Sequence, residues 1–122
     1  MNSADQTATE VVVALSGGAT EDARAVFGVL GSAFASDRAA DDVPQELPGK
    51  RPTVWTATFD VADLRSRPGP VRLTAPVTAD VQGGYRAVDS LREALSTAFT
   101  VRVVGTASGD QEEEVQLRLE NR

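Results

Sequence analysis

The chain has 122 residues with a formal net charge of −6, and it contains neither cysteine nor histidine. This composition excludes disulfides, thiolate metal sites, His-ligated zinc and catalytic triads that use His, so we expect no metal and no cofactor. The negative net charge and the lack of a basic run argue against binding of nucleic acid. No apolar run approaches the ~20 residues of a membrane span, and the first residues lack the regions of a signal peptide. Together these features predict a cytoplasmic protein.

Residues 1–9 are small and polar, and we expect a flexible tail before one α+β domain at 10–121. Residues 10–15 carry apolar side chains on both faces of an extended segment. This pattern predicts a strand that is central in its sheet or covered on both sides.

A helix is predicted after Gly17 and Gly18. Thr20 is a plausible N-cap, and the acidic residues that follow, Asp22 among them, favour the positive end of a helix. Apolar residues then recur at helical spacing, which extends the predicted helix to about Ser36.

The segment 37–52 has three prolines and mixed charge, and it predicts a long surface loop that is either mobile or functional. Clean alternation predicts strands at 54–61 and 71–81, which we expect to form a hairpin. Pro76 is awkward in this interpretation because it lacks the N–H group that an interior strand needs. The apolar positions of the first strand include Trp55 and Phe59, which are expected in the core.

A second helix is predicted at 85–99, followed by strands at 101–106 and 115–119 joined by an acidic turn. We expect the last strand to pair with the one before it and to lie at an edge of the sheet. Its alternating charged residues would discourage uncontrolled pairing there.

The two halves resemble each other in sequence. Residues 30–34 and 95–99 match at a constant offset, and a glycine pair precedes each helix. This suggests an internal repeat. The element order predicts a two-layer α+β sandwich, ferredoxin-like with a split β-α-β-β-α-β topology and an extra C-terminal strand, in which two helices cover one face of a mainly antiparallel sheet.

The glycines at 17–18 lie where phosphate-binding loops lie, between a strand and a helix. Residues 15–19 also resemble the signature sequence of ABC ATPases, but the chain has no G-x-x-x-x-G-K-[ST] loop. The two glycine pairs are expected at opposite ends of the sheet, which favours a structural turn at each helix start. The alternative is a sensor of an anionic metabolite, with a site at Gly17, Gly18, Ala19 and Thr20.

The second sheet face is predicted to be free of helices. It favours an intracellular, non-enzymatic interaction module that binds a second copy of itself, as a homodimer, or another protein. The residues expected on this face are Thr56, Thr58, Asp60, Arg72, Thr74 and Thr78. A further alternative is a small histidine-free enzyme that uses Asp60, Asp80 or Tyr85 with an arginine; it requires a pocket lined by at least two of these three residues.

Overall fold

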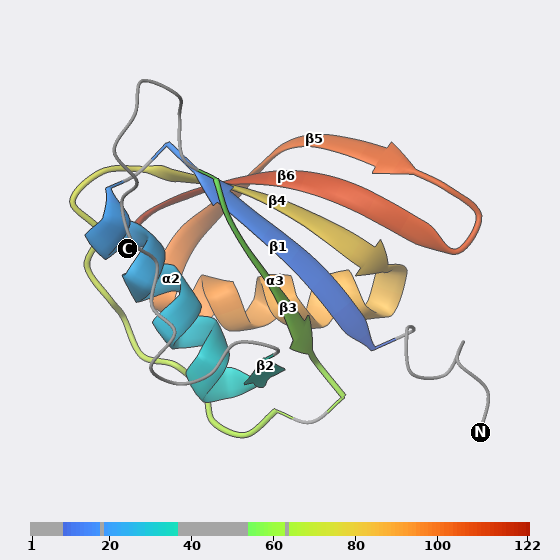
Figure 1. The fold of residues 1–122 in the computed structure, drawn as a ribbon, viewed down its shortest axis with the longest axis horizontal. Coiled ribbons are helices and arrows are strands. Elements are labelled where there is room, and N and C mark those ends of the chain that lie inside the picture. The colour runs from blue at the N-terminus through green and yellow to red at the C-terminus, as the bar shows by residue number, and fades with distance from the viewer. Residues whose placement is uncertain (1–8, 18, 37–53, 63) are drawn as a thin grey trace.

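The computed structural model describes residues 9–17, 19–36, 54–62 and 64–122. The predicted tail, except for Thr9, and the predicted loop at 37–52 therefore lie outside the described residues. The elements are β1 (Glu10–Ser16), α2 (Thr20–Ala33), β2 (Ala35–Ser36), β3 (Trp55–Asp60), β4 (Val77–Gly84), α3 (Tyr85–Ala98), β5 (Phe99–Ser108) and β6 (Glu112–Asn121). They form an α+β structure with one sheet and two helices (Figure 1).

All neighbouring strands are antiparallel, in the order β2-β3-β1-β4-β6-β5. The α+β class and the antiparallel sheet are confirmed, but the strand order does not confirm the ferredoxin-like arrangement. The predicted hairpin between the second and third long strands is wrong, because β1 lies between β3 and β4. Val13 shows this directly, since it pairs with Ala57 on one side and with Val81 on the other.

The long connection between β3 and β4 explains the separation of these two strands. Residues 64–76 run past α2 instead of turning back along the sheet, as the light green to yellow trace in Figure 1 shows. The backbone N–H of Arg65 donates to the carbonyl of Ala33 at 2.7 Å, and the Ser66 hydroxyl donates to the carbonyl of Ser32 at 2.8 Å. These bonds hold the chain against the end of α2, so it enters the sheet on the far side of β1.

The strand before the second helix is shorter than predicted. β4 begins at Val77, so Pro76 precedes the strand and removes no hydrogen bond from the sheet. The preceding residues are irregular, but Leu73 is still buried. The side-chain amide of Asn121 holds it by accepting from the Leu73 N–H at 2.7 Å and donating to the Leu73 carbonyl at 2.9 Å.

The last two strands, β5 and β6, pair through the predicted turn, but the strand at the edge of the sheet is β5 and not β6. β6 lies between β4 and β5, so the prediction of an edge position for the final strand is wrong. The burial pattern gives the reason: β6 buries Val115, Leu117 and Leu119, whereas β5 buries only Phe99. A strand with a continuous apolar face gains more from a central position over the helices.

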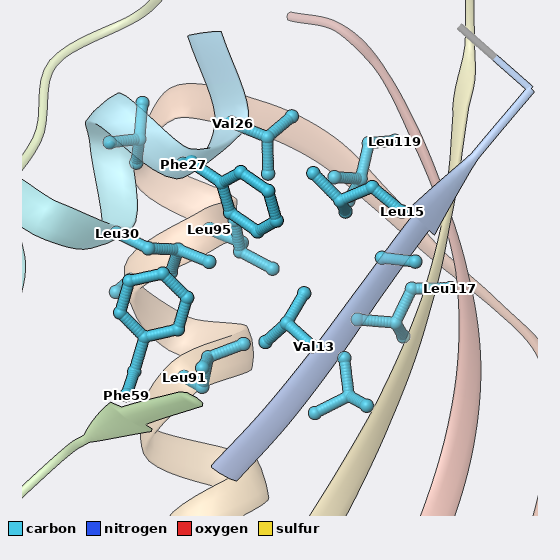
Figure 2. Close-up of a cluster of buried hydrophobic side chains, with 14 of the residues drawn as sticks. Val13, Leu15, Val26, Phe27, Leu30, Phe59, Leu91, Leu95, Leu117 and Leu119 are labelled. Carbon is cyan, nitrogen blue, oxygen red and sulfur yellow. The ribbon is translucent and has the colours of Figure 1, made fainter. Parts of the chain in front are cut away.

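Both predicted helices are present, and both cover the same face of the sheet (Figure 2). The first ends at Ala33, before the predicted Ser36, and Ala19 is its N-cap instead of Thr20. Trp55 and Phe59 are buried, which confirms the core prediction for them. The fully buried side chains that fill the layer between sheet and helices include Val13, Leu15, Val26, Leu30, Phe59, Leu91, Leu95, Leu117 and Leu119.

The two halves of the chain follow the same path. Each runs through a central strand, a helix of 14 residues, an outer strand and then the strand between outer and central positions. The helices also end alike, since the N–H of Phe34 donates to the Leu30 carbonyl and the N–H of Phe99 to the Leu95 carbonyl. The internal repeat itself stays a prediction.

Candidate functional site

The start of α2 is organised around a buried carboxylate. Gly17 adopts a positive φ of 86°, which turns the chain out of β1 and which side chains disfavour. Asp22, only 1% exposed, reaches back from the first turn of the helix, and its Oδ2 accepts the N–H of Ala19 at 3.1 Å. This is one half of a capping box, and it satisfies a donor at the N-terminal end of the helix.

The same carboxylate also binds the segment that leads into β4. Its Oδ1 accepts the backbone N–H of Thr74 at 2.7 Å, and its Oδ2 accepts the Thr74 hydroxyl at 2.7 Å. Burial tends to raise the pKa of Asp22, but the hydrogen bonds from Thr74, Ala19 and the backbone of Ala75 outweigh it and lower the pKa below its ordinary value. Asp22 is therefore an ionised residue that joins the start of α2 to the segment before β4. Its position in the sequence indicates only a preference for the start of a helix.

This geometry bears on the predicted anion site at Gly17, Gly18, Ala19 and Thr20. Gly18 lies outside the described residues, and Thr20 is the first helical residue, with a buried hydroxyl that has no hydrogen-bond partner among the described residues. An internal carboxylate already occupies the positive end of the helix, and it would repel a second anion. The site stays a prediction, and the position of Asp22 disfavours it.

Gly17, the described member of the first glycine pair, and the second pair at Gly83 and Gly84 lie at opposite ends of the β1–β4 pair, as predicted, because these strands are antiparallel. Only the first of them makes a turn. Gly83 lies within β4, where an added Cβ would come within 2.9 Å of the Glu10 carbonyl oxygen. Glycine is required there for the close approach of two backbones rather than for a change of direction.

The structure does not bring the candidate catalytic groups together. Asp60 pairs with Glu10 and accepts the N–H of Ala62, whereas Asp80 lies two strands away and accepts from the side-chain amide of Gln116. The Tyr85 hydroxyl donates to the carbonyl of Gly109 and so ties the start of α3 to the β5–β6 turn. Within the described part of the chain, no group of three or more acidic residues could hold a metal ion.

No helix of the described residues covers the second face of the sheet, which we call the open face, and it carries four of the six residues predicted for it: Thr56, Thr58, Asp60 and Thr78. Thr74 lies away from this face, because it binds Asp22 of α2, and Arg72 precedes β4 and is not part of the sheet. Sequence reasoning assigned them to this face because alternation continues through the irregular segment.

On β1 and β3 this face bears a run of short, uncharged side chains, with Asp80 of β4 beside it and Glu10 and Asp60 at one end. One row across the strands is Thr58–Val12–Gln82, and the next is Thr56–Ala14–Asp80. Val12 is 40% exposed although it lies on a central strand. We call the five residues Val12, Ala14, Ser16, Thr56 and Thr58 of β1 and β3 the central strip.

Charged residues gather on the β5–β6 side of the same face. Arg102 and Arg118 lie directly opposite each other on β5 and β6. The Glu120 carboxylate forms an ion pair with each of them, at 3.2 Å and 3.3 Å, and so offsets their mutual repulsion. All three side chains are at least partly exposed, so these ion pairs contribute little to stability. They define a charged flank beside the uncharged central strip.

The outer strand β5 projects past the helices with the β5–β6 turn (Figure 1). The register shifts between Val103 and Gly105, which is the mark of a β-bulge, and the bulged Val104 is 60% exposed. Bulges of this kind are common on sheet edges, where they disturb pairing with other chains.

A hollow of about 350 Å³ lies outside the core, between the outer side of α3, the end of α2 and the segment after β3. Asp60, Asp80 and Tyr85 are not among its described lining residues, so the arrangement required by the enzyme alternative is not found there. The residues that line it are Phe34, Val61, Ala62, Leu64, Arg67, Pro68, Ser90, Glu93, Ala94 and Thr97. Sequence reasoning missed this hollow, because its walls are formed by segments that are far apart in the chain.

Relationships to known proteins assign no function to these features. None of the helices in the described part of the chain has both the length and the apolar character needed to cross a membrane. Comparisons with protein-family models, with curated proteins and with solved structures give no significant match.

Proposed function

We infer that the protein is a non-enzymatic interaction module that associates with a second copy of itself through the open face of the sheet. The observation that carries this proposal is the arrangement of that face: an uncharged central strip on β1 and β3 beside a charged flank on β5 and β6. Stable interfaces commonly have such a core, depleted of charge, with a polar rim around it.

The physical argument concerns what the central strip loses by staying in water. Val12 exposes an apolar β-branched side chain in the middle of the face, beside the short side chains of Ala14 and Ser16. Short side chains lose little conformational entropy when they are covered, and they let a flat partner approach closely. A second copy offers the same strip, so a two-fold contact would place uncharged side chains against uncharged side chains.

The proposal is tested by sedimentation velocity over a range of protein concentrations. We expect the unmodified protein to form a dimer that buries well above ~1,000 Å² in total. Val12→Lys puts a charge in the centre of the strip and should raise the dimer dissociation constant at least about tenfold, because an ammonium group would be desolvated there without a partner.

Val104→Lys is the matched control. It makes the same chemical change at an exposed valine that lies on the edge strand, outside the central strip. Dimerisation that resists Val104→Lys but not Val12→Lys supports the open face. A monomer at all concentrations, or a dimer that dissociates only with Val104→Lys, contradicts it; the second result would make the β5 edge the interface.

A further inference from the structure

The hollow beside α3 has features that the proposed self-association does not use. Its floor is apolar and comes from the buried Phe34 and Ala94, and Val61, Leu64 and Pro68 extend this apolar surface on one side. Leu64 is 49% exposed, so an apolar ligand group that covered it would remove a large side chain from water. The volume is near the lower end of small-molecule sites, which suits a compact ligand.

The side of the hollow formed by residues after β3 is held in place before any ligand binds. The N–H of Val61 donates to the Thr9 carbonyl at 2.9 Å, and Asp60 accepts the N–H of Ala62 at 2.9 Å. Further along, Arg65 and Ser66 bond to the end of α2. The described residues on both sides of Leu64 are anchored, so they lose little additional freedom when a ligand binds.

The opposite side is one polar stripe of α3. Ser90, Glu93 and Thr97 recur at helical spacing, with the small Ala94 among them. The Thr97 hydroxyl donates to the Ala94 carbonyl, which leaves its oxygen lone pairs to accept from a ligand. This side therefore offers a carboxylate and two hydroxyl groups.

Among the described residues that line the hollow, two carry opposite charges and form no ion pair with each other. Arg67 lies on the anchored segment and Glu93 on α3, and neither forms an ion pair with another described residue. A purely anionic ligand would meet the Glu93 carboxylate, and a purely cationic ligand would meet the Arg67 guanidinium. A small molecule that carries both charges can satisfy the two at once, with its carboxylate on Arg67 and its ammonium on Glu93.

We propose that this hollow binds a free α-amino acid with an apolar side chain. Arg67 receives the α-carboxylate, Glu93 receives the α-ammonium with help from Ser90 and Thr97, and the side chain covers the apolar floor at Phe34. The inference does not depend on self-association, because the hollow lies on the helix side of the sheet and the central strip lies on the other.

The test is an amide NMR titration of the whole chain with L-leucine and with L-phenylalanine. Dissociation constants of such small ligands are in the millimolar range, so each amino acid is added to a concentration of about 10 mM. We expect saturable shifts at the residues that line the hollow. N-acetyl-leucine lacks the ammonium and leucinamide lacks the carboxylate, so each should bind at least about tenfold more weakly than leucine.

Charge variants assign the two groups. Arg67→Gln should weaken the binding of leucine about tenfold and leave the residual affinity for leucinamide unchanged. Glu93→Gln should also weaken the binding of leucine, but it should leave the residual affinity for N-acetyl-leucine unchanged. Arg65→Gln and Asp89→Asn change exposed charges on the same two segments outside the lining, and they should bind leucine like the unmodified protein. Each spectrum also reports whether the variant is folded.

Three results would overturn the proposal. They are the absence of saturable shifts with either amino acid, equal binding of leucine and its two blocked derivatives, and unchanged leucine affinity in both lining variants. Self-association would be unaffected by any of them.

Discussion

Replacing Asp22 by alanine should destabilise the fold without removing any apolar contact. The carboxylate is 1% exposed and accepts from the N–H of Ala19 and from both the N–H and the hydroxyl of Thr74. Alanine leaves these three donors without their acceptor. The contact between the start of α2 and the segment before β4 is then lost.

The magnitude follows from the donors. A hydrogen bond to an ionised group contributes about 1.5–3 kcal/mol, but the exposed Thr74 can turn its hydroxyl to water, so only the two backbone donors count fully. Using the lower value for each, Asp22→Ala should lower the free energy of unfolding by about 3 kcal/mol. For a chain of this length the melting temperature should fall by about 10 °C. Asp22→Asn keeps one oxygen acceptor and should lose roughly half as much free energy.

The pH dependence separates charge from shape. Because the pKa of folded Asp22 lies below its ordinary value of 3.8, the ionised carboxylate contributes stability above that value and loses it as the pH falls through the lower folded pKa. Chemical denaturation of the unmodified protein and of Asp22→Asn should therefore show a constant difference above about pH 5, and the two should converge in more acidic solution. Thr74→Val, which removes only the hydroxyl, serves as the control and should cost about 1 kcal/mol.

Two results would refute this reasoning about Asp22. One is a loss of less than about 1 kcal/mol for Asp22→Ala, which would mean that water replaces all its bonds. The other is a difference from Asp22→Asn that grows as the pH falls below 4, which would mean that the folded pKa is raised rather than lowered.

Two other structural contacts lead to further predictions. Gly83→Ala should lower the free energy of unfolding by about 1–3 kcal/mol, because the new Cβ would lie 2.9 Å from the Glu10 carbonyl oxygen. Gly28→Ala, on the exposed side of α2, is the control and should raise the free energy of unfolding by up to ~1 kcal/mol. Equal effects of the two variants in thermal denaturation would contradict the close approach at Gly83. Asn121→Ala should cost about 2 kcal/mol, since its amide replaces a strand partner for both backbone groups of Leu73. Faster amide hydrogen exchange at Leu73 in this variant would locate the loss, whereas unchanged exchange would speak against that role.

The candidate sites differ in how far sequence alone could lead. Alternation within strands placed Thr56, Thr58 and Thr78 on the open face, because side chains of a strand point to opposite faces whatever its neighbours are. The hollow could not be predicted, since Arg67 and Glu93 line the same space only after the chain has passed α2. Asp22 lay between these cases: its place in the first helical turn was visible, but its bonds to Thr74 span 52 positions.

Local patterns in the sequence determined the two helices, the long strands in outline and most of the buried apolar residues. Each of these depends on the periodicity of apolar residues within one segment. The strand order was decided only by the tertiary structure. The pattern that buries one face of β3 is satisfied equally beside β1 or beside β4, and backbone hydrogen bonds are the same for either neighbour. The choice is made by distant contacts, among them the bonds of Asp22 to Thr74 that carry the connection past α2.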